Sequence, residues 1–488
     1  MNDTSSILVV GGGSSGWMTA AYLSRALPET LITVVESSAI PTIGVGESTN
    51  RTMHYFQQAI GLDEKLFMRA SNAAYKIAIR FVNFNRPGGI FYHPFGVPDT
   101  PDAGLFEPNA ATRFKSYHLA ELDNLFSKEC AYSFQIDAGL YGQYLKEVCT
   151  QRFGVRSVVD RVQGIELDDR GAIGRVHTEK SGPLVADLYL DCSGFRSILL
   201  GRALGEPFES YSQFLLNDKA VAARIPYMDK ERELVTYTNC TALSAGWVWT
   251  IPLWNRIGTG YVYCGAFLSS SQAEEEFRQF LGVERAKHVE FSRLDIRTGR
   301  HRRAWVENCV GIGISYGFLE PLESTGLSLT QLSIHDLATA LRSGEPRQAQ
   351  ADLFNTRQAA VFDATRDFVM AHYVLTSRDD TPYWRQIRNE NPIPDTLRNI
   401  FEDVQNGSYE TIRKQPYKFY ETMNWNTILS GMGYFGEERA STPPLLNFST
   451  LASHAKLLQT SVFDGDYCDD PEHFSDPIGA HPSWYSTW

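Results

Sequence analysis

Residues 6–16, SILVVGGGSSG, decide the fold, because a short apolar strand runs directly into the glycine pattern G-x-G-x-x-G. Residues 17–27 then have helical periodicity, and LITVVE at 31–36 is a second strand that ends in an acid. In such a unit the glycine backbone approaches a pyrophosphate at the helix N-terminus, and the acid binds a ribose hydroxyl. A glycine turn that serves packing alone is the alternative. We predict a dinucleotide site at Gly11, Gly13, Ser14, Ser15, Gly16 and Glu36.

The composition is that of a large folded protein with a net negative charge. Of the 488 residues, 43% are hydrophobic and 21% are charged, which is enough for a full core. The formal net charge is −12 and no Lys/Arg run is visible, so we expect neither a nucleic-acid partner nor an acidic membrane partner. No apolar run reaches the ~18 residues of a membrane span, and the N-terminus has no signal-peptide pattern.

Cysteine and histidine spacing argues against metal and disulfide frameworks. The seven cysteines are scattered, odd in number and never form a C-x-x-C pair, which is typical of a reducing compartment. The histidines show no H-E-x-x-H or similar ligand spacing. We therefore expect a cytoplasmic protein without a metal site.

The rest of the chain alternates between sheet and helix without an internal repeat. YKIAIRFVNF at 75–84 has the alternation of one strand, and 86–112 is predicted to be a long loop rich in Pro, Gly and aromatic residues. Further sheet is predicted at 155–162, 174–179, 187–194 and 233–267. Helices are predicted at 326–342 and 350–375, whereas 376–450 lacks a clear period and the acidic stretch from Asp464 is predicted to be a surface loop.

A second set of segments favours FAD over NAD. Residues 191–196, DCSGFR, form an isolated D-x-S-G-x-R, and Gly311-Ile312-Gly313-Ile314 precedes a turn and a helix. Together with the glycine turn, these distant pieces resemble the FAD-dependent hydroxylase superfamily. The fold class expected from this resemblance is α/β, with a Rossmann-like FAD-binding domain of the flavin monooxygenase type assembled from discontinuous segments. We expect that domain at 1–200 and 301–345, an antiparallel-sheet region at 201–300 and a mainly helical substrate-capping region at 346–488.

Seven motifs narrow the resemblance. They are GGGSSGWM (11–18), GVGES (44–48), YKIAIRFVNF (75–84), DCSGFRSILL (191–200), GWVWTIP (246–252), FLEPLESTGL (318–327) and SRDDTPYW (377–384). With them, residues 7 to about 440 resemble the flavin-dependent halogenases of the tryptophan-halogenase type. The W-x-W-x-I-P box and the strand lysine combined with the E-S-T-G turn are the most specific parts.

This resemblance implies a reaction and a set of residues. In the family, FADH2 from a separate flavin reductase reacts with oxygen, a bound halide becomes hypohalous acid, and this reagent crosses a tunnel to a lysine beside an aromatic substrate. The lysine would be Lys76, the assisting carboxylate Glu323, and the halide site the backbone amides of Thr325 and Gly326. Further implied FAD contacts are Glu47, Ser48, Val162, Ile314 and Leu327. The reductase is expected to act by diffusion of FADH2, and a homodimer is left open.

The position of Lys76 on its predicted strand bears on the reactivity of its amine. If 75–84 is one strand, Lys76 shares a face with Ala78, Arg80 and Val82. Burial there would lower the pKa of the amine and increase its reactivity. A snorkelling or ion-paired lysine is the alternative that the residues alone leave open.

The turn at 318–327 is predicted to begin a helix. Pro321 sets a turn, Ser324 and Thr325 are good N-cap residues, and Gly326 allows close approach. Free amides at a helix N-terminus bind anions, and a halide is an anion. A plain cap is the alternative, and Glu323 is either a capping acid or a group that moves protons.

Aromatic side chains complete the predicted site. Trp247 and Trp249 are two residues apart on a strand, so both indoles share one face. On the family interpretation they form a wall between flavin and substrate; a core strand is the alternative. The resemblance also implies that His93, Pro94 and Phe95, in the long aromatic loop, line the substrate pocket; for His93 a solvent-facing loop position is the alternative.

One segment departs from the family pattern. Tryptophan-specific members carry a tyrosine pair and a glutamate that grip the charged end of the amino acid, whereas this chain has QPYKFYETMNWNTILSGMG at 415–433. Phe419 and Tyr420 would occupy the aromatic positions. We therefore expect halogenation, with chloride or bromide, of an indole-like substrate rather than free tryptophan. The alternatives are a tryptophan halogenase with an altered segment, an FAD-dependent aromatic hydroxylase, and a flavin-binding protein without turnover.

Overall fold

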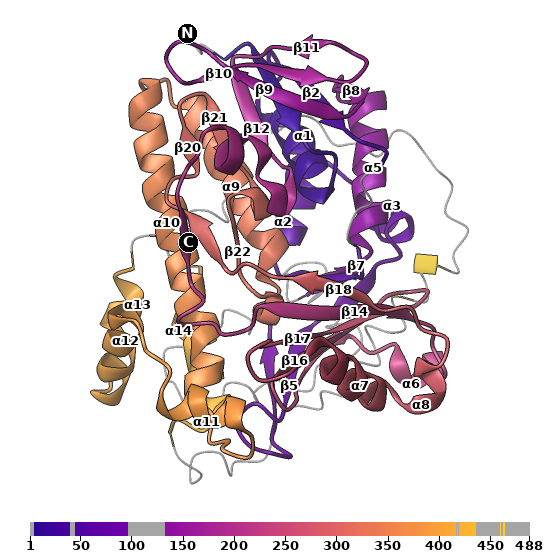
Figure 1. Cartoon of the computed structure of the whole chain (residues 1–488), viewed down its shortest axis with the longest axis vertical. Helices are drawn as coiled ribbons and strands as arrows, with labels where there is room; N and C mark the ends of the chain where they lie inside the picture. Colours follow the sequence, from indigo (N-terminus) through magenta and orange to yellow (C-terminus); the bar gives the residue numbers. More distant parts are fainter. Residues whose placement is uncertain are drawn as a thin grey trace, which may run out of the picture.

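The computed structural model describes residues 4–39, 44–95, 132–415, 417, 419–435, 459 and 462–463. A six-stranded sheet in the order β20-β21-β12-β1-β2-β8 forms the upper half in Figure 1. Its strands come from distant segments: β1 (Ser6–Val10), β2 (Leu31–Glu36), β8 (Arg156–Val159), β12 (Leu188–Asp191), β20 (Trp305–Val306) and β21 (Cys309–Gly311). All pairs are parallel except β20 with β21. A parallel core built from separated segments requires crossovers, and α1 (Ser14–Ala26) is the first.

The glycine turn between β1 and α1 depends on missing side chains. Gly11 has φ +121°, and a Cβ there would lie 2.3 Å from the carbonyl oxygen of Cys192. A Cβ on Gly16 would lie 1.8 Å from the carbonyl oxygen of Gly11. Because these positions lack side chains, the turn packs closely against the end of β12. The predicted strand–turn–helix unit is confirmed.

A second sheet of seven strands, in the order β18-β14-β17-β16-β15-β5-β6, forms the lower half. Its bounds are β5 (Ala78–Val82), β6 (Ile90–Pro94), β14 (Lys219–Ile225), β15 (Tyr237–Ala242), β16 (Gly246–Pro252), β17 (Ile257–Tyr263) and β18 (Ser292–Asp295). The predicted antiparallel sheet at 233–267 is confirmed by β15, β16 and β17. The sheet also contains β5 and β6, and β5 pairs in parallel with β15.

The prediction of one strand at 75–84 is wrong. Residues Ala74–Lys76 form β4 in a small sheet with β3 (Glu47–Ser48) and β7 (Ser133–Ile136), and β5 begins only at Ala78. Ile77 lies at the break: its N–H donates to the carbonyl of Thr236, and its carbonyl accepts from the N–H of Phe95. The chain changes sheets there, so the alternation that grouped Lys76 with Ala78 does not continue across Ile77.

Two other local predictions need correction. Residues 155–162 are not one strand, because β8 ends at Val159 in the main sheet while β9 (Val162–Leu167) pairs with β10 (Ile173–Thr178), next to β11 (Pro183–Leu184). His93 is not in a loop: β6 pairs with β5, and His93 lies opposite Ile79. The sequence around His93 does not indicate a strand, because Pro94 and the aromatic stretch after it are typical of a loop. Residues 96–112 of the predicted aromatic loop and the stretch from Asp464 lie outside the described residues.

Helices cover the sheets and connect the two halves. Helix α9 (Thr325–Arg342) packs against α1, and α10 (Arg347–Val374) runs past both sheets in Figure 1; both helices confirm their predictions. The region 376–450, which lacks a clear sequence period, contains α11 (Pro382–Asn389), α12 (Asp395–Gln405), α13 (Glu410–Arg413) and α14 (Thr422–Gly431). The remaining described helices of four or more residues are α2 (Thr52–Ile60), α3 (Glu64–Ala70), α5 (Ala138–Gln151), α6 (Lys230–Glu233), α7 (Ser270–Leu281), α8 (Val283–Ala286) and the π-helix η3 (Ile198–Ala203).

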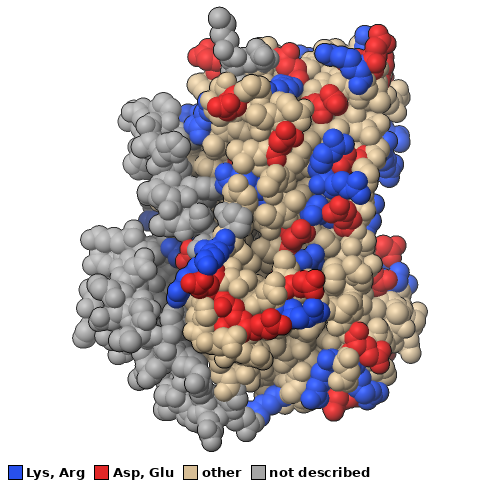
Figure 2. Space-filling model, turned by 90° about the vertical axis from the view of Figure 1, so that its left-hand side faces the viewer, with Lys and Arg blue, Asp and Glu red and all other residues tan. Residues whose placement is uncertain are grey.

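The surface carries mixed charge. Figure 2 shows basic and acidic side chains interspersed over the described part of one face. Within the described residues, no helix combines the length and apolar character that crossing a membrane needs. In the same part of the chain, no group of three or more His, Cys, Asp or Glu side chains is arranged to bind a metal ion.

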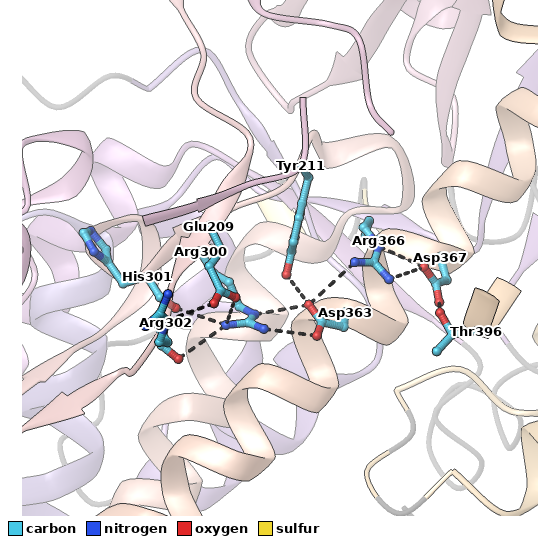
Figure 3. Close-up of polar contacts among 9 residues, drawn as sticks. All are labelled: Glu209, Tyr211, Arg300, His301, Arg302, Asp363, Arg366, Asp367 and Thr396. Atoms are coloured by element: carbon cyan, nitrogen blue, oxygen red, sulfur yellow. Dashed lines mark hydrogen bonds and ion pairs between the residues drawn. The ribbon is translucent and has the colours of Figure 1, made fainter. Parts of the chain in front are cut away.

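A charged cluster fastens α10 to the strands that lead into the E-S-T-G turn (Figure 3). Arg300, on β19 (Gly299–His301), donates two hydrogen bonds to Asp363 of α10, at 3.2 and 3.1 Å. Asp363 also accepts from the hydroxyl of Tyr211, and Arg300 contacts Glu209 of β13 (Phe208–Ser210) at 2.9 Å. Because β19 pairs with β22 (Gly317–Phe318), which precedes the turn, this cluster fixes the turn relative to α10.

We predict that Asp363→Ala lowers the free energy of unfolding by about 1–3 kcal/mol, the cost of removing the acceptor of two charged hydrogen bonds from a buried guanidinium that keeps, among the described residues, only Glu209 as an ion-pair partner. Arg300 is only 7% exposed, so water does not replace the lost carboxylate. Chemical denaturation measures the change. Asp352→Ala, an exposed position on the same helix, is the matched control and should stay within ~0.5 kcal/mol. Equal effects in the two variants would contradict this role.

Candidate active site

The E-S-T-G turn adopts a strained conformation. Ser324 has φ 59° and ψ 36°, in the left-handed region that costs a non-glycine residue roughly 1–2 kcal/mol. It stands at the N-cap of α9, yet its side chain makes no capping hydrogen bond, which corrects the sequence prediction. The hydroxyl instead bonds inward, to Lys76 and Ser48. The Ser324 hydroxyl therefore does not cap the amides of Thr325 and Gly326, and a Cβ on Gly326 would meet no atom of the described residues within 4 Å.

Lys76 is fully buried beside this turn. Its ammonium donates to the carbonyl of Thr49 at 2.8 Å and to the hydroxyl of Ser324 at 2.7 Å. It also lies 4.4 Å from the ring centroid of Phe95, a cation–π distance. Burial lowers the pKa of Lys76 to about 7, while Cys240 and Glu323 act in the opposite direction. The predicted burial of this amine is therefore confirmed.

Glu323 is held by two histidines and does not contact Lys76 directly. Its Oε2 lies 2.7 Å from Nδ1 of His93, and its Oε1 lies 2.7 Å from Nε2 of His372 on α10. Although burial raises its pKa, the nearby histidines dominate and lower the pKa of Glu323 to about 2. Glu323 is therefore a carboxylate, and the next residue, Ser324, is the one that contacts Lys76.

The hydrogen bonds assign the protons on both histidines. Nδ1 of His372 lies 3.0 Å from the carbonyl of Phe368, which only accepts, so both ring nitrogens of His372 carry protons. His93 differs, because Nδ2 of Asn424 faces its Nε2 at 3.1 Å, and Oδ1 of Asn424 is occupied by the N–H of Glu421. Nδ1 of His93 therefore donates to Glu323, and Nε2 of His93 accepts from Asn424. Glu323 thus accepts one hydrogen bond from each histidine.

The tryptophan pair is attached to the same turn. Trp247 and Trp249 both point to one core face of β16, with ring centroids 6.2 Å apart, whereas Val248 points to the other face. Trp247 donates from Nε1 to Glu320 at 2.8 Å, and Glu320 also accepts from Tyr373 of α10 at 2.6 Å. The shared face predicted from sequence is confirmed. Gly260 makes room for the second indole, because a Cβ there would lie 2.2 Å from Trp249.

Aromatic side chains gather around Glu323 on the side of α10 and α14. Tyr420 stacks on Phe368 with centroids 3.6 Å apart, and Trp425 meets Phe368 edge-on at 5.0 Å. Phe419 packs edge-on against Tyr420 at 4.8 Å. The side chain of Pro94 lies outside what the structure describes. Sequence reasoning missed His372, Asn424, Trp425 and Glu320; only the E-x-x-E spacing within 318–327 was a usable signal.

Several of the predicted cofactor residues lie around the glycine turn between β1 and α1. A Cβ on Gly313 would lie 2.6 Å from Oγ of Ser15, so the segment that carries Ile314 sits against the glycine turn. Glu36 accepts from Trp17 Nε1 at 3.2 Å and pairs with Lys146. Val162 follows Asp160, whose N–H donates to the carbonyl of Glu36 at 2.8 Å.

The remaining three cofactor residues lie nearer the E-S-T-G turn. Leu327 is in the first turn of α9, Ser48 bonds Ser324, and burial raises the pKa of Glu47 to about 7.

The comparisons with known proteins agree with this arrangement. The family model described as tryptophan halogenase matches residues 6–444. The chain belongs to the tryptophan halogenase family. The tryptophan 6-halogenase SttH of Streptomyces toxytricini is 37% identical, over 88% of this chain and 90% of that protein. The 7-chloro-L-tryptophan 6-halogenase KtzR of Kutzneria sp. (strain 744) is 39% identical, over 84% of this chain and 87% of its own length.

Solved structures show the same relationship. Tar14, a tryptophan C-6 flavin-dependent halogenase from taromycin biosynthesis, superimposes with a TM-score of 0.78 at 36% identity, covering 93% of this chain and 97% of its own. BrvH, a flavin-dependent halogenase from Brevundimonas sp. BAL3, gives a TM-score of 0.76 at 30% identity, covering 97% and 98%. This family member is therefore a flavin-dependent halogenase with a Rossmann-like FAD-binding fold.

The halogenase has the features that a flavin dinucleotide needs. A Cβ on Gly13 would meet no atom of the described residues within 4 Å, which leaves room for a pyrophosphate at the N-terminus of α1. Phe195 and Ile314 are 40% and 39% exposed, high values for apolar side chains beside a glycine turn. These residues fit an apolar ring system that continues from a phosphate group.

We predict that Lys76→Met raises the melting temperature at pH 6 and that this gain shrinks as pH rises. The folded-state pKa of Lys76, about 7, lies below the unfolded value, so unfolding takes up a proton between the two values. The wild type is therefore least stable, relative to the variant, below pH 7, and it recovers as pH approaches ~10. Calorimetry at several pH values measures the difference, and a constant difference would contradict a lowered pKa.

Proposed function

We propose that the halogenase attaches chloride or bromide to an aromatic ring, using FADH2 from a separate flavin reductase that supplies it by diffusion. When bound, the reduced flavin supplies, with oxygen, the oxidising equivalent that converts halide into hypohalous acid. Lys76 receives this reagent through a tunnel and presents it to the substrate. The single observation that carries the proposal is a buried lysine of lowered pKa, hydrogen-bonded to the serine that stands at the N-cap of α9 without capping its amides.

Each side chain has a proposed role. The amides of Thr325 and Gly326 bind the halide, because uncapped helix N-termini attract anions. Glu323 takes the proton that the ring loses on substitution, since two histidines keep it ionised in a buried place. Trp247 and Trp249 separate flavin from substrate, so only a small oxidant passes. FAD contacts are proposed at Gly11, Gly13, Ser14, Ser15, Gly16, Glu36, Glu47, Ser48, Val162, Ile314 and Leu327.

We further propose an indole-like substrate without an amino-acid group. Within residues 419–433, Glu421 is the single carboxylate, and its side chain is exposed. Tyr420 is buried, and its hydroxyl has no hydrogen-bond partner among the described residues, which suits a polar atom on an aromatic ring. Free tryptophan is the competing substrate, because the relatives SttH and KtzR are named for tryptophan and chlorotryptophan.

We also propose three domains: the FAD-binding domain at 1–200 and 301–345, the antiparallel-sheet region at 201–300 and the substrate-capping region at 346–488. A cytoplasmic location is proposed as well. The five cysteines among the described residues are free and buried, in agreement with a reducing compartment.

We predict that indole-type rings are preferred over free tryptophan. The enzyme is incubated with a generic flavin reductase, NADH, FAD, oxygen and bromide or chloride, and products of single and paired substrates are identified by mass spectrometry. The expected result is a kcat/KM at least about tenfold higher for the indole-type ring, the effect of one unmatched charged group. Efficient, saturable conversion of tryptophan at micromolar concentration would contradict the substrate proposal and leave the halogenase proposal intact.

We predict that Lys76→Ala abolishes halogenated product while flavin oxidation continues. Lys76→Arg should fail as well, because a guanidinium stays charged and offers no amine lone pair. Product yield and flavin oxidation are measured side by side. Lys219→Ala, which removes a partly exposed lysine on β14, is the matched control. Product at the wild-type level from Lys76→Ala would overturn the proposed role.

We predict that Gly326→Ala raises the halide concentration for half-maximal rate several-fold while FAD affinity stays within about twofold. The added methyl group enters open space, so the turn keeps its conformation while the anion loses room. Halide titrations and flavin fluorescence measure the two effects. Equal losses of halide and FAD binding would indicate a distorted turn instead of a halide site.

A further inference from the structure

Four buried polar side chains form a line that ends at Lys76. From Lys76 the line runs to Ser324 (2.7 Å), Ser48 (2.9 Å), Thr238 (2.6 Å) and the amide oxygen of Gln135 (3.2 Å). Each of these residues is at most 8% exposed. The chain joins β15, β7, β3 and the E-S-T-G turn to the lysine of β4.

The direction of every hydrogen bond along this line of side chains is determined. Nε2 of Gln135 donates to the carbonyl of Val235 at 3.3 Å, so Oε1 is the atom that faces Thr238. An amide oxygen only accepts, and therefore Thr238 must donate to it. A hydroxyl has one proton, so Thr238 accepts from Ser48, Ser48 accepts from Ser324, and Ser324 accepts from Lys76. Ser324 donates its only hydroxyl proton to Ser48, so a lone pair of the Ser324 oxygen faces the amine of Lys76.

This orientation decides where the lone pair of a neutral Lys76 lies. A neutral amine has two N–H groups and one lone pair. The carbonyl of Thr49 takes one N–H and the hydroxyl of Ser324 takes the other. The lone pair is left at the third position around Nζ, which no hydrogen-bond acceptor among the described residues occupies.

We propose that Gln135 and Thr238 are positioning residues that keep the lone pair of Lys76 free for the halogen. The proposal rests on the proposed role of Lys76. In the step concerned, the lone pair forms the N–halogen bond with hypohalous acid and the O–halogen bond breaks. The hydroxide released takes a proton from the nitrogen and leaves as water. Hypohalous acid, the product of the proposed flavin-side reaction, supplies the oxidising equivalent.

Without the hydrogen bonds to Ser48, Thr238 and Gln135, the Ser324 hydroxyl is free to rotate and donate its proton to the lone pair of Lys76. That hydrogen bond stabilises the neutral amine and also occupies the lone pair that must react with the halogen. The titratable groups that face Lys76 are Cys240 from β15 and Glu323 from the turn, and Glu323 carries His93 and His372 with it. Neither group contacts Thr238 or Gln135 through a hydrogen bond in the described residues, so a change in the chain acts on Lys76 separately from them.

The test compares Thr238→Val, which keeps the shape but removes the hydroxyl, with Thr238→Ser, which keeps the hydroxyl. The pKa of Lys76 is measured by NMR of lysine side-chain carbons in the flavin-free protein, with the signal assigned by its absence in Lys76→Met. Thr238→Val should lower this pKa by about half to one unit, the effect of one buried hydrogen bond. Halogenated product per flavin oxidised should fall about two- to tenfold, the same energy expressed as a rate. Thr238→Ser should match the wild type in both.

A wild-type pKa and product yield in Thr238→Val would overturn the inference, and so would equal losses in Thr238→Val and Thr238→Ser without a pKa change. Gln135→Met, which removes the terminal acceptor, gives the same test if Thr238→Val does not fold. Product at the wild-type level from Lys76→Ala would instead overturn the proposed function, so the two failures are distinguishable.

Discussion

The left-handed conformation of Ser324 is the constraint on which the site depends. In an ordinary N-cap the serine hydroxyl would bond to the amides of its own helix. Here the backbone turns that hydroxyl inward to Lys76 and Ser48, so it does not cap the first amides of α9. One strained residue thus separates an anion-attracting helix end from a buried amine while keeping them in the same turn. The strain persists because surrounding contacts fix both ends of the turn.

Helix α10 supplies most of that fixation. Consecutive residues His372 and Tyr373 bond Glu323 and Glu320, which lie on either side of Pro321. Nine residues earlier, Asp363 bonds Arg300, on the strand paired with the one leading into the turn. The turn is therefore held from α10 at two levels. The same Glu320 receives the indole N–H of Trp247, so the tryptophan strand is part of one rigid assembly.

Those parts of the structure whose sequence signals are local could be predicted. Periodicity and the glycine turn locate β1, α1, α9 and α10, and alternation places both tryptophans on one face. The break at Ile77 was not predictable, since one of the bonds that cause it comes from Thr236, far away in the chain, and the other from Phe95, at the end of the following hairpin. His372 and Asn424 were missed for the same reason: each has an ordinary helical surrounding, and only tertiary contact brings it to Glu323. The inward hydroxyl of Ser324 contradicts the local capping rule for a tertiary reason too, because buried Lys76 needs an acceptor.

The central claim is that the E-S-T-G turn binds the halide at its free amides while its serine bonds the amine. Crystals of the halogenase soaked in bromide and measured at the bromine absorption edge would locate the ion directly. The account predicts one anomalous peak within hydrogen-bonding distance of the Thr325 and Gly326 amides, with the Ser324 hydroxyl still bonded to Lys76. A bromide in direct contact with the Lys76 ammonium and none at the helix amides would contradict it.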